Sequence, residues 1–245
     1  MTNHTILITG GSSGIGYGIA EYFYKKGWQV LITGRNKEKL NAAKKAMEKI
    51  HVFEYHSSEK RQIDQICTFI KEHCGARLDI LVNSAGHVQL GGLRDIRGED
   101  LEAMYGAHLI GPTLLSSACL DFLIPTKGHI LNITSSHGIK AYADLSAYGS
   151  AKAGLNMLTK IWALELAPLG IKVNAVAPGP TNTEILKSAG YDQETVLAIK
   201  ESEKRQIPLQ RRGNVEDIVT VAVAILLSDW TTGVIIPVDG GVSIS

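Results

Sequence analysis

The sequence has little cysteine, and its cysteines lack the spacing of metal or redox motifs. Only three occur among 245 residues, and no two are separated as C-x-x-C. An odd number of widely spaced thiols argues against both a disulfide framework and a zinc site. No group of histidine, cysteine and acidic residues has metal-ligand spacing either. We therefore predict reduced thiols in a cytoplasmic protein, without a catalytic metal.

An excess of charge and a long apolar run are also missing. Lysine and arginine number 25 against 24 acidic residues, for a formal net charge of +1. Such a balance gives no reason to expect nucleic acid or an anionic membrane surface as a partner. No uninterrupted apolar stretch is long enough to span a bilayer, and the opening residues 1–6 lack the basic segment of a signal peptide. We expect neither a membrane segment nor a nucleic-acid site.

Short β-rich segments alternate with longer helical patterns along the whole chain. Several of the short segments are continuously apolar, which is typical of parallel strands covered on both faces. The alternation predicts right-handed βαβ units and a doubly wound α/β fold. Helical patterns include Ile15–Lys26 and Lys37–Lys49. The expected strands are Thr5–Thr9, Gln29–Thr33, His51–Tyr55, Asp79–Asn83, His129–Thr134, Lys172–Ala177 and Val234–Val238.

A glycine-rich turn follows the first expected strand. It reads T-G-G-S-S-G-I-G from Thr9 and leads directly into a helix. Glycines allow a tight turn and a close approach of the backbone to a pyrophosphate, and a helix N-terminus offers free N–H groups to that anion. A plain turn is the alternative, but the place between strand and helix favours a dinucleotide site. Its expected members are Gly10, Ser12, Ser13, Gly14, Ile15 and Gly16.

The spacing T-G-x-x-x-G-x-G resembles that of the short-chain dehydrogenase/reductase family, and later segments strengthen the resemblance. These segments are Asn83-Ser84-Ala85-Gly86, Tyr148-Gly149-Ser150-Ala151-Lys152, Pro178-Gly179 and Asp239-Gly240-Gly241, in order along nearly the whole chain. Within the family, the chain is most similar to reductases of the 3-oxoacyl-carrier-protein type and related secondary-alcohol dehydrogenases. The resemblance implies a single Rossmann domain over residues 1–245, with seven parallel strands in the order 3-2-1-4-5-6-7.

The end of the second expected strand indicates which dinucleotide is bound. NAD-binding units usually carry an acid here, whereas this chain has Gly34 followed by Arg35. A guanidinium can hold a 2′-phosphate, and no carboxylate is adjacent to repel it. We therefore predict NADP(H) as the cofactor, with Arg35 at its phosphate. A solvated arginine is the alternative, and Arg35 argues against the rival reading of an NAD-dependent alcohol dehydrogenase.

The resemblance implies further cofactor contacts near the central strands. Asn83 is similar to the residue that steadies the central strand beside the cofactor, and Ala85 and Gly86 belong to the same segment. The third strand of the family usually ends in an acid that bonds the adenine amino group. His56 stands there in this chain, and its ring can still make one hydrogen bond.

The segment after the sixth expected strand resembles the one that holds the nicotinamide end. The resemblance implies that Pro178 and Gly179 shape the turn, that the backbone near Thr181 bonds the carboxamide, and that the Thr183 hydroxyl touches phosphate. An ordinary proline-glycine turn is the alternative. The region from Pro178 to Gly190 has little regular pattern, and we predict a substrate lid at about residues 183–202.

Tyr148, Lys152 and Ser135 are the expected catalytic residues. Tyr148 and Lys152 are four apart in the helical pattern Ala147–Leu166, so they share one helix face. A free tyrosine has a pKa of about 10, and a nearby ammonium lowers it by roughly 1–3 units, so the phenol can exchange a proton with a carbonyl oxygen. Ser135 ends a strand and can hold that oxygen, although Thr134 and Ser136 compete for this role.

His108 stands where the family usually has an asparagine, in the run His108-Leu109-Ile110-Gly111. In the family this position kinks a helix, and its main-chain carbonyl holds a water that links the lysine to solvent. Histidine titrates near pH ~6.5 when unperturbed, and its cation near Lys152 would disfavour a second positive charge. Our hypothesis is that the rate falls on the acid side as His108 protonates. A neutral histidine that only packs is the alternative.

These residues predict hydride transfer between NADP(H) and a ketone or secondary alcohol, with a 3-oxoacyl thioester as one candidate substrate. A non-catalytic NADP(H)-binding regulatory protein is the alternative, although such relatives usually lose the Tyr/Lys pair. His87, His137 and Tyr142 either face the substrate or are plain loop residues. The long helix near Glu99–Leu123 and the helix of Tyr148 resemble those that pair subunits in the family, which implies a homotetramer or a dimer.

Overall fold

The computed structural model describes residues 4–56, 59–188 and 190–245, and its centre is a parallel sheet of seven strands. The order is β3-β2-β1-β4-β5-β6-β7, which confirms the predicted topology. Strand ends differ from the expected ones by one residue in places. Asp79, for example, lies just outside β4, and its carboxylate accepts a hydrogen bond from the Thr5 N–H. The strands are β1 (Thr5–Thr9), β2 (Gln29–Gly34), β3 (His51–Glu54), β4 (Ile80–Asn83), β5 (His129–Ile133), β6 (Lys172–Pro178) and β7 (Ile235–Val238).

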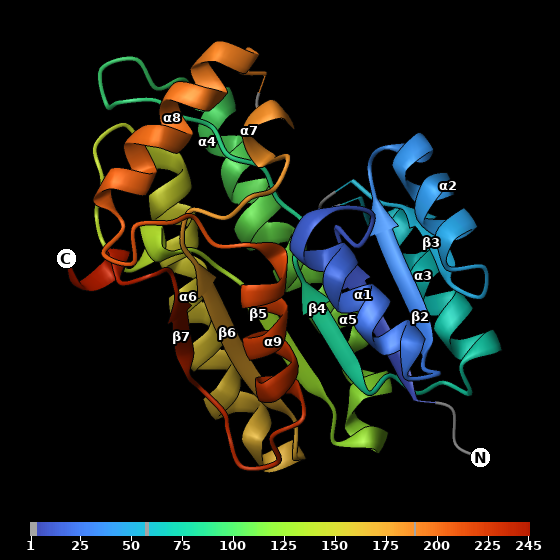
Figure 1. Cartoon of the computed structure of the whole chain (residues 1–245). Helices are drawn as coiled ribbons and strands as arrows, with labels where there is room; N and C mark the ends of the chain where they lie inside the picture. The colour runs from blue at the N-terminus through green and yellow to red at the C-terminus, as the bar shows by residue number, and fades with distance from the viewer. Residues whose placement is uncertain (1–3, 57–58, 189) are drawn as a thin grey trace.

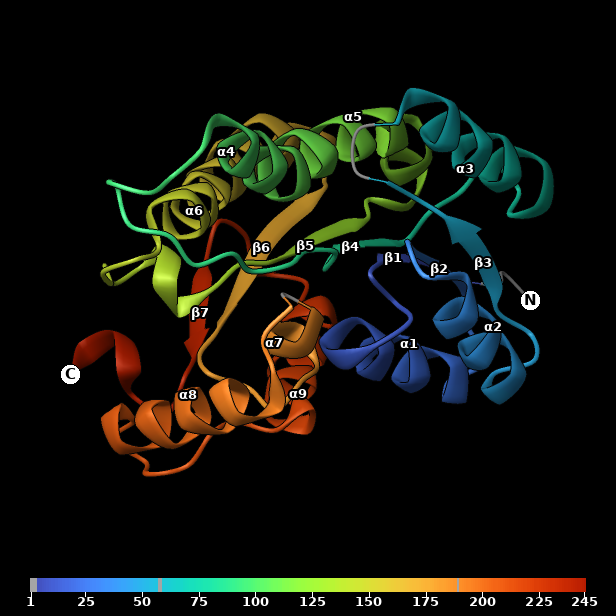
Figure 2. The ribbon, with the colours of Figure 1, turned by 90° about the horizontal axis from the view of Figure 1, so that it is seen from above.

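Helices cover both faces of this sheet, as Figures 1 and 2 show. One face carries α3, α5 and α6, and the other carries α1, α2 and α9 (Figure 2). The remaining helices, α4, α7 and α8, lie at the edge formed by the carboxyl ends of the strands (Figure 1). The helices are α1 (Gly14–Lys25), α2 (Lys37–Ala46), α3 (Lys60–His73), α4 (Gly98–Tyr105), α5 (Gly111–Leu123), α6 (Ser146–Leu166), α7 (Ile185–Ser188), α8 (Gln193–Gln206) and α9 (Val215–Leu226).

The apolar core has two layers, one on each side of the sheet. In β1, Ile6 and Ile8 pack toward α1, α2 and α9, whereas Leu7 packs toward α3, α5 and α6. Successive side chains of a strand point to opposite faces, so a strand covered on both faces must be apolar throughout. This arrangement explains why the sequence shows continuous apolar runs rather than alternation.

The expected long helix near Glu99–Leu123 is interrupted. α4 leads into a π-helical turn at Gly106–Ile110, and α5 follows it. The hydrogen bonds of a π turn span five residues, one more than in an α-helix, and such turns are often found at functional sites. The turn contains His108, at the position where the resemblance implied a kink.

The combined helical run Gly98–Thr126 is long and apolar enough to cross a membrane by length and composition, with a mean hydropathy of 1.4. In this fold 44% of that window is buried, and α5 packs against α3 and β4. Core helices pass the same test, so the run is weak evidence for a membrane. Its contacts with the sheet favour the interpretation as a core helix.

Candidate active site

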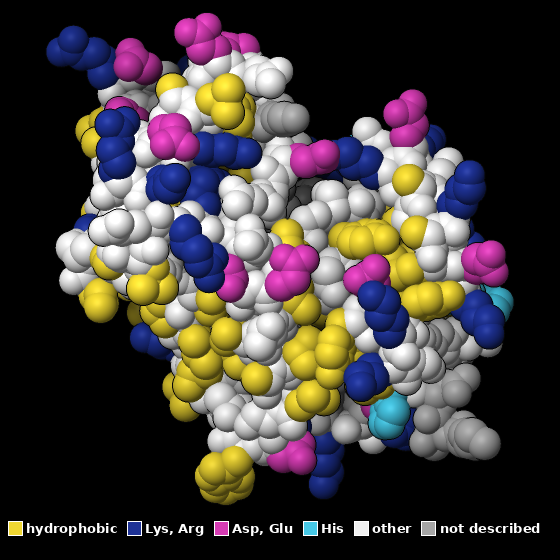
Figure 3. Space-filling model, in the orientation of Figure 1, with side chains coloured by type: hydrophobic (Ala, Val, Ile, Leu, Met, Phe, Trp, Pro, Cys, Tyr) yellow, Lys and Arg dark blue, Asp and Glu magenta, His cyan; other side chains and the backbone are white. Residues whose placement is uncertain are grey.

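A cavity of about 560 Å³ opens at the carboxyl ends of the strands. Figure 3 shows the surface hollowed there, between the α7–α8 side and the β2–α2 side. Ligands of open α/β sheets bind at this edge. Many of the predicted site residues line the cavity: Gly10, Ser13, Gly14, Ile15, Gly86, His108, Ser135, Tyr148, Lys152, Pro178, Gly179, Thr181 and Thr183. The other predicted positions are outside its lining: Ser12, Gly16, Arg35, His56, Asn83 and Ala85.

The glycine-rich turn between β1 and α1 has a shape that side chains would block. Gly10 and Gly14 adopt positive φ angles of 66° and 55°. A Cβ on Gly16 would lie 2.5 Å from the Gly10 carbonyl oxygen. The N-cap residue Ser13 makes no side-chain cap bond, so the first N–H groups of α1 have no side-chain acceptor there. Free N–H groups beside a bare backbone turn suit a phosphate group.

Gly34 and Arg35 lie at the end of β2. A Cβ on Gly34 would be 2.9 Å from the Ser12 hydroxyl oxygen, so an acidic side chain here requires Ser12 to move. Arg35 is exposed, and its guanidinium makes no ion pair with any residue that the structure describes. The nearby Lys39 ammonium, by contrast, is bonded to the Glu184 carboxylate at 2.6 Å. Arg35 is therefore a cation that is available for an added anion.

His56 and Asn83 lie outside the cavity lining for different reasons. The His56 side chain is 50% exposed and faces the Glu54 carboxylate at 3.6 Å, and nothing places it against a ligand. Asn83 is buried, and its amide nitrogen donates to Asn132 Oδ1 at 2.9 Å and to Ser116 Oγ at 3.1 Å. These bonds join β4 to β5 and α5, so Asn83 supports the strands beneath the cavity.

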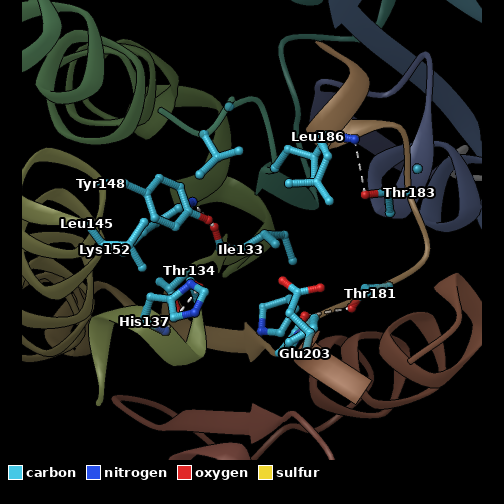
Figure 4. Close-up of a pocket in the computed structure, with 18 of the residues that line it drawn as sticks. Ile133, Thr134, His137, Leu145, Tyr148, Lys152, Thr181, Thr183, Leu186 and Glu203 are labelled. Atoms are coloured by element: carbon cyan, nitrogen blue, oxygen red, sulfur yellow. Dashed lines mark hydrogen bonds between the residues drawn. The ribbon is translucent and has the colours of Figure 1, made fainter. Parts of the chain in front are cut away.

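Tyr148, Lys152 and Ser135 meet at the cavity wall, where Figure 4 shows Tyr148 and Lys152 entering from α6. All three are buried. The Lys152 ammonium lies 5.8 Å from the centre of the Tyr148 ring and donates to the Ile133 carbonyl oxygen at 2.8 Å. The Ser135 hydroxyl accepts the His137 N–H at 3.1 Å, and it lies near enough to the Tyr148 phenol to lower the pKa of that group. The phenol and the hydroxyl therefore converge on one point of the cavity.

The expected fall in the tyrosine pKa is wrong for this structure. Burial raises the pKa of Tyr148, and only the influence of the Ser135 hydroxyl opposes that rise. Burial also lowers the pKa of Lys152 to about 7. Desolvation disfavours the charged form of either group. The sequence showed the Tyr/Lys spacing but not this loss of solvent, which raises the pKa of the phenol and lowers that of the ammonium.

His108 is fixed against the tyrosine. Its side chain is 1% exposed, its Nε2 is 2.8 Å from the His87 carbonyl oxygen, and its ring centre lies 5.4 Å from that of Tyr148. Burial, then the neighbouring charge of Lys152, holds the pKa of His108 well below its usual range. His108 is therefore neutral at ordinary pH, and the acid effect expected from the sequence moves to lower pH.

Comparison with known proteins agrees with this geometry. Residues 10–243 match the sequence profile of a family described as enoyl-(acyl-carrier-protein) reductase. The chain belongs to the short-chain dehydrogenase/reductase family. The family binds a nicotinamide cofactor, and this member is an oxidoreductase. The predicted family membership is thereby confirmed.

Individual relatives cover nearly the whole of this short-chain dehydrogenase/reductase. An uncharacterized oxidoreductase of Bacillus subtilis, YxbG, is 34% identical over 99% of this chain and 92% of its own. The 3-oxoacyl-[acyl-carrier-protein] reductase FabG of Thermotoga maritima is 33% identical over 97% of each chain. A short-chain dehydrogenase/reductase of unknown function from Caenorhabditis elegans, solved with cofactor, has a TM-score of 0.91, is 27% identical and covers 99% of this chain and 96% of its own.

The side of the cavity opposite Tyr148 contains residues that the sequence analysis missed. Glu203 and Arg212 form an ion pair there, and α8 continues beyond the expected lid boundary at Ser202, so that Glu203 and Gln206 also line the cavity. No local motif marks these positions, because they meet only in the fold. Of the three loop residues left open, His137 and Tyr142 line the cavity and His87 does not.

Gly86 and His108 form a tight contact that yields a stability prediction. A Cβ on Gly86 would lie 2.3 Å from the His108 Cε1 atom. The ring has no room to retreat, because it is buried beside Tyr148. We expect Gly86→Ala to lower the free energy of unfolding by about 1–3 kcal/mol, as overpacking does. Urea unfolding measures this loss, and Gly86→Ala combined with His108→Ala should lose less than the two single variants together. Strict additivity would contradict the contact.

The buried histidine also leads to a pH prediction. The charged groups acting on His108 are Lys152, His87 and Arg35, all of which oppose its protonation. As the pH falls through the lowered pKa, a buried cation forms beside Lys152, and we expect the rate to fall there. The unfolded chain binds this proton nearer pH ~6.5, so acid below that value also lowers the free energy of unfolding.

Comparing pH–rate profiles of the native protein and His108→Asn tests this expectation. The native acid limb should lie below pH ~6.5, the ordinary range of histidine, and should be absent from an active Asn variant. An identical acid limb in both proteins, or an inactive variant, would show that His108 does not control the rate.

Proposed function

We propose that this protein is an NADP(H)-dependent oxidoreductase that transfers a hydride between the nicotinamide and a ketone or secondary alcohol. The observation that carries the proposal is the buried convergence of the Tyr148 phenol and the Ser135 hydroxyl on one point of the cavity, beside Lys152. A pair of hydroxyl groups at one point suits a single carbonyl oxygen.

The chain's own groups fit the cofactor. The uncapped start of α1 and the bare turn at Gly10 and Gly14 suit the pyrophosphate, and Arg35 suits a 2′-phosphate. Thr181 and Thr183 line the cavity on the side opposite Tyr148 (Figure 4), where the nicotinamide end would be held. The bound nicotinamide supplies or accepts the hydride. We do not assign His56 to the adenine, because the ring is half exposed beside Glu54.

Proton transfer belongs to the protein. Ser135 orients the carbonyl oxygen by a hydrogen bond, and the Tyr148 hydroxyl donates the proton that this oxygen takes up during reduction. In the oxidative direction the phenolate accepts the proton. The Lys152 ammonium, which donates to the Ile133 carbonyl oxygen, would hold ribose hydroxyls of a bound cofactor, and its charge would favour the phenolate form of Tyr148.

The cavity wall indicates an apolar substrate body. The apolar side chains that line the cavity include Val88, Leu90, Leu145, Leu186 and Ile199. Apolar pockets with few polar groups bind apolar ligands and orient them by those groups. A 3-oxoacyl thioester is one candidate, supported by the similarity to the 3-oxoacyl-[acyl-carrier-protein] reductase of Thermotoga maritima. We propose that residues 1–245 act as one domain, with a lid at about 183–202 over this substrate.

Turnover separates the proposed enzyme from a regulatory protein that only binds NADP(H). Oxidation of NADPH and of NADH is followed by absorbance with a panel of acyl and cyclic ketones. We expect turnover with at least one ketone and a preference for NADPH. Binding of NADPH without any turnover across the panel favours the regulatory protein, and a preference for NADH favours the NAD-dependent dehydrogenase.

Association into a homotetramer or dimer is a further part of the proposal. Apolar side chains are exposed along α5 and α6 and on the adjoining π turn, namely Ile110, Leu114, Met157, Ile161 and Leu164. An exposed apolar stripe of this kind marks an interaction surface. Sedimentation equilibrium gives the mass directly, and a monomer at micromolar concentration would contradict this part of the proposal.

A further inference from the structure

Arg212 is a buried cation at the base of the lid. Its side chain is 8% exposed, two of its three nitrogens donate hydrogen bonds to neutral acceptors, and the third forms an ion pair. Nη2 donates to the Thr181 carbonyl oxygen at 2.7 Å, and Nε donates to the Asn182 side-chain oxygen at 3.1 Å. The remaining nitrogen, Nη1, pairs with the Glu203 carboxylate of α8.

The chain around Arg212 is also bonded to the segment after β6. The Gly213 N–H donates to the Pro180 carbonyl at 3.0 Å, and the Asn182 N–H donates to the Gly213 carbonyl at 2.8 Å. Arg212 therefore moves with residues 180–182. These residues include Thr181, the position at which the proposed function puts the nicotinamide carboxamide.

Helix α8 is otherwise attached through Val196 and Ile199, which belong to the apolar cluster around Tyr148. Of its residues only Val196 is buried, and Leu197 is 56% exposed. Among the residues that the structure describes, the pair of Arg212 with Glu203 is the one salt bridge that joins α8 to another element. Glu203 lies beside Thr181 in the cavity wall (Figure 4), with its side chain 26% exposed. Its carboxylate can therefore reach solvent if α8 moves away.

A guanidinium that is buried among neutral acceptors alone is unfavourable, because its charge has lost water without gaining a counter-charge. Closure of α8 supplies that counter-charge through Glu203. The position of α8 and the order of residues 180–182 thus stabilise each other. Two sites joined in this way influence each other reciprocally.

Resting on the proposed function, we infer that Arg212 is a positioning residue that couples closure of the lid helix to placement of the nicotinamide end of the cofactor. Arg212 acts through the Thr181 carbonyl on one side and through Glu203 on the other. Nothing in this role requires contact with the substrate.

Binding of a cofactor and of its adenosine half tests the coupling. Affinities for NADPH and for adenosine 2′,5′-bisphosphate, which lacks the nicotinamide, are measured by titration calorimetry. We expect Arg212→Met to lower the affinity for NADPH by about tenfold and to leave the affinity for the bisphosphate unchanged. A general structural defect would weaken both ligands alike, and that result, or no loss at all, overturns the inference.

A matched control is the neighbouring Arg211, which is exposed and pairs with Asp217 of α9 at 2.7 Å. Arg211→Met should change the affinity for neither ligand. Glu203→Gln keeps the size of the side chain and removes only its charge, so it serves if Arg212→Met does not fold. Glu203→Gln should also lower the affinity for NADPH and not that for the bisphosphate. An unchanged NADPH affinity in this variant overturns the inference.

Amide hydrogen exchange without any ligand tests the lid side independently. We expect the amides of α8 to exchange faster in Arg212→Met and in Glu203→Gln than in the native protein, with no change in Arg211→Met. Equal exchange in all four proteins overturns the coupling. If the native protein binds neither NADPH nor NADH, the proposed function fails, whereas the exchange comparison still decides whether the ion pair holds α8.

Discussion

The Tyr148→Phe variant should lose turnover by a factor of roughly 10²–10⁴ while binding NADPH as the native protein does, because it lacks only the general acid. The phenol lies at the cavity wall beside Ser135, and the ring packs against His108. Phenylalanine keeps that packing and removes the hydroxyl. Steady-state rates with the best ketone of the panel, together with NADPH titration, measure both effects.

Two comparisons make this result specific. Tyr142 is a second tyrosine of the cavity wall, and Tyr142→Phe should keep most of the turnover, since Ser135 influences the phenol of Tyr148 and not that of Tyr142. Lys152→Ala should damage both turnover and cofactor binding, because the ammonium is expected to reach ribose hydroxyls as well. Substantial turnover in Tyr148→Phe would mean that another group donates the proton.

The Arg35→Ala variant should lose affinity for NADPH by an order of magnitude or more and change little toward NADH. A hydrogen bond to a charged group contributes about 1.5–3 kcal/mol, which corresponds to roughly ten- to hundredfold in affinity. The guanidinium has no ion pair within the described structure, so its removal should not disturb the fold. Fluorescence titration of both cofactors measures the difference.

Lys37→Ala is the matched control for Arg35. Lys37 is an exposed cation at the start of α2 whose ammonium pairs with Glu54 at 3.1 Å. Its loss should leave the ratio of NADPH to NADH affinity unchanged. The preference of the native protein for NADPH over NADH should also weaken with added salt, because salt screens an exposed ion pair between Arg35 and the 2′-phosphate. An equal loss of affinity for NADPH and NADH in Arg35→Ala would refute the assignment of Arg35 to the 2′-phosphate.

Most of the fold could be predicted from the sequence because its signals are local. Apolar runs, helical periods and the glycine turn after Thr9 each depend on residues close together in the chain. Right-handed βαβ connections then leave few arrangements of the strands. The same holds for Tyr148 and Lys152, whose shared face follows from the helix repeat. Arg35 could be found in the same way, since it directly follows a strand end.

Burial and contacts between distant residues were decided only by the tertiary structure. The pKa of Tyr148 rises because the fold removes solvent from it, and His108 stays neutral because it is buried against Gly86, His87 and Tyr148. The pairing of Arg212 with Glu203 depends on how α8 lies over residues 180–182. Desolvation and ion pairing depend on atoms brought together in space, so sequence spacing determined which residues carry the chemistry, and packing determined their charge states and partners.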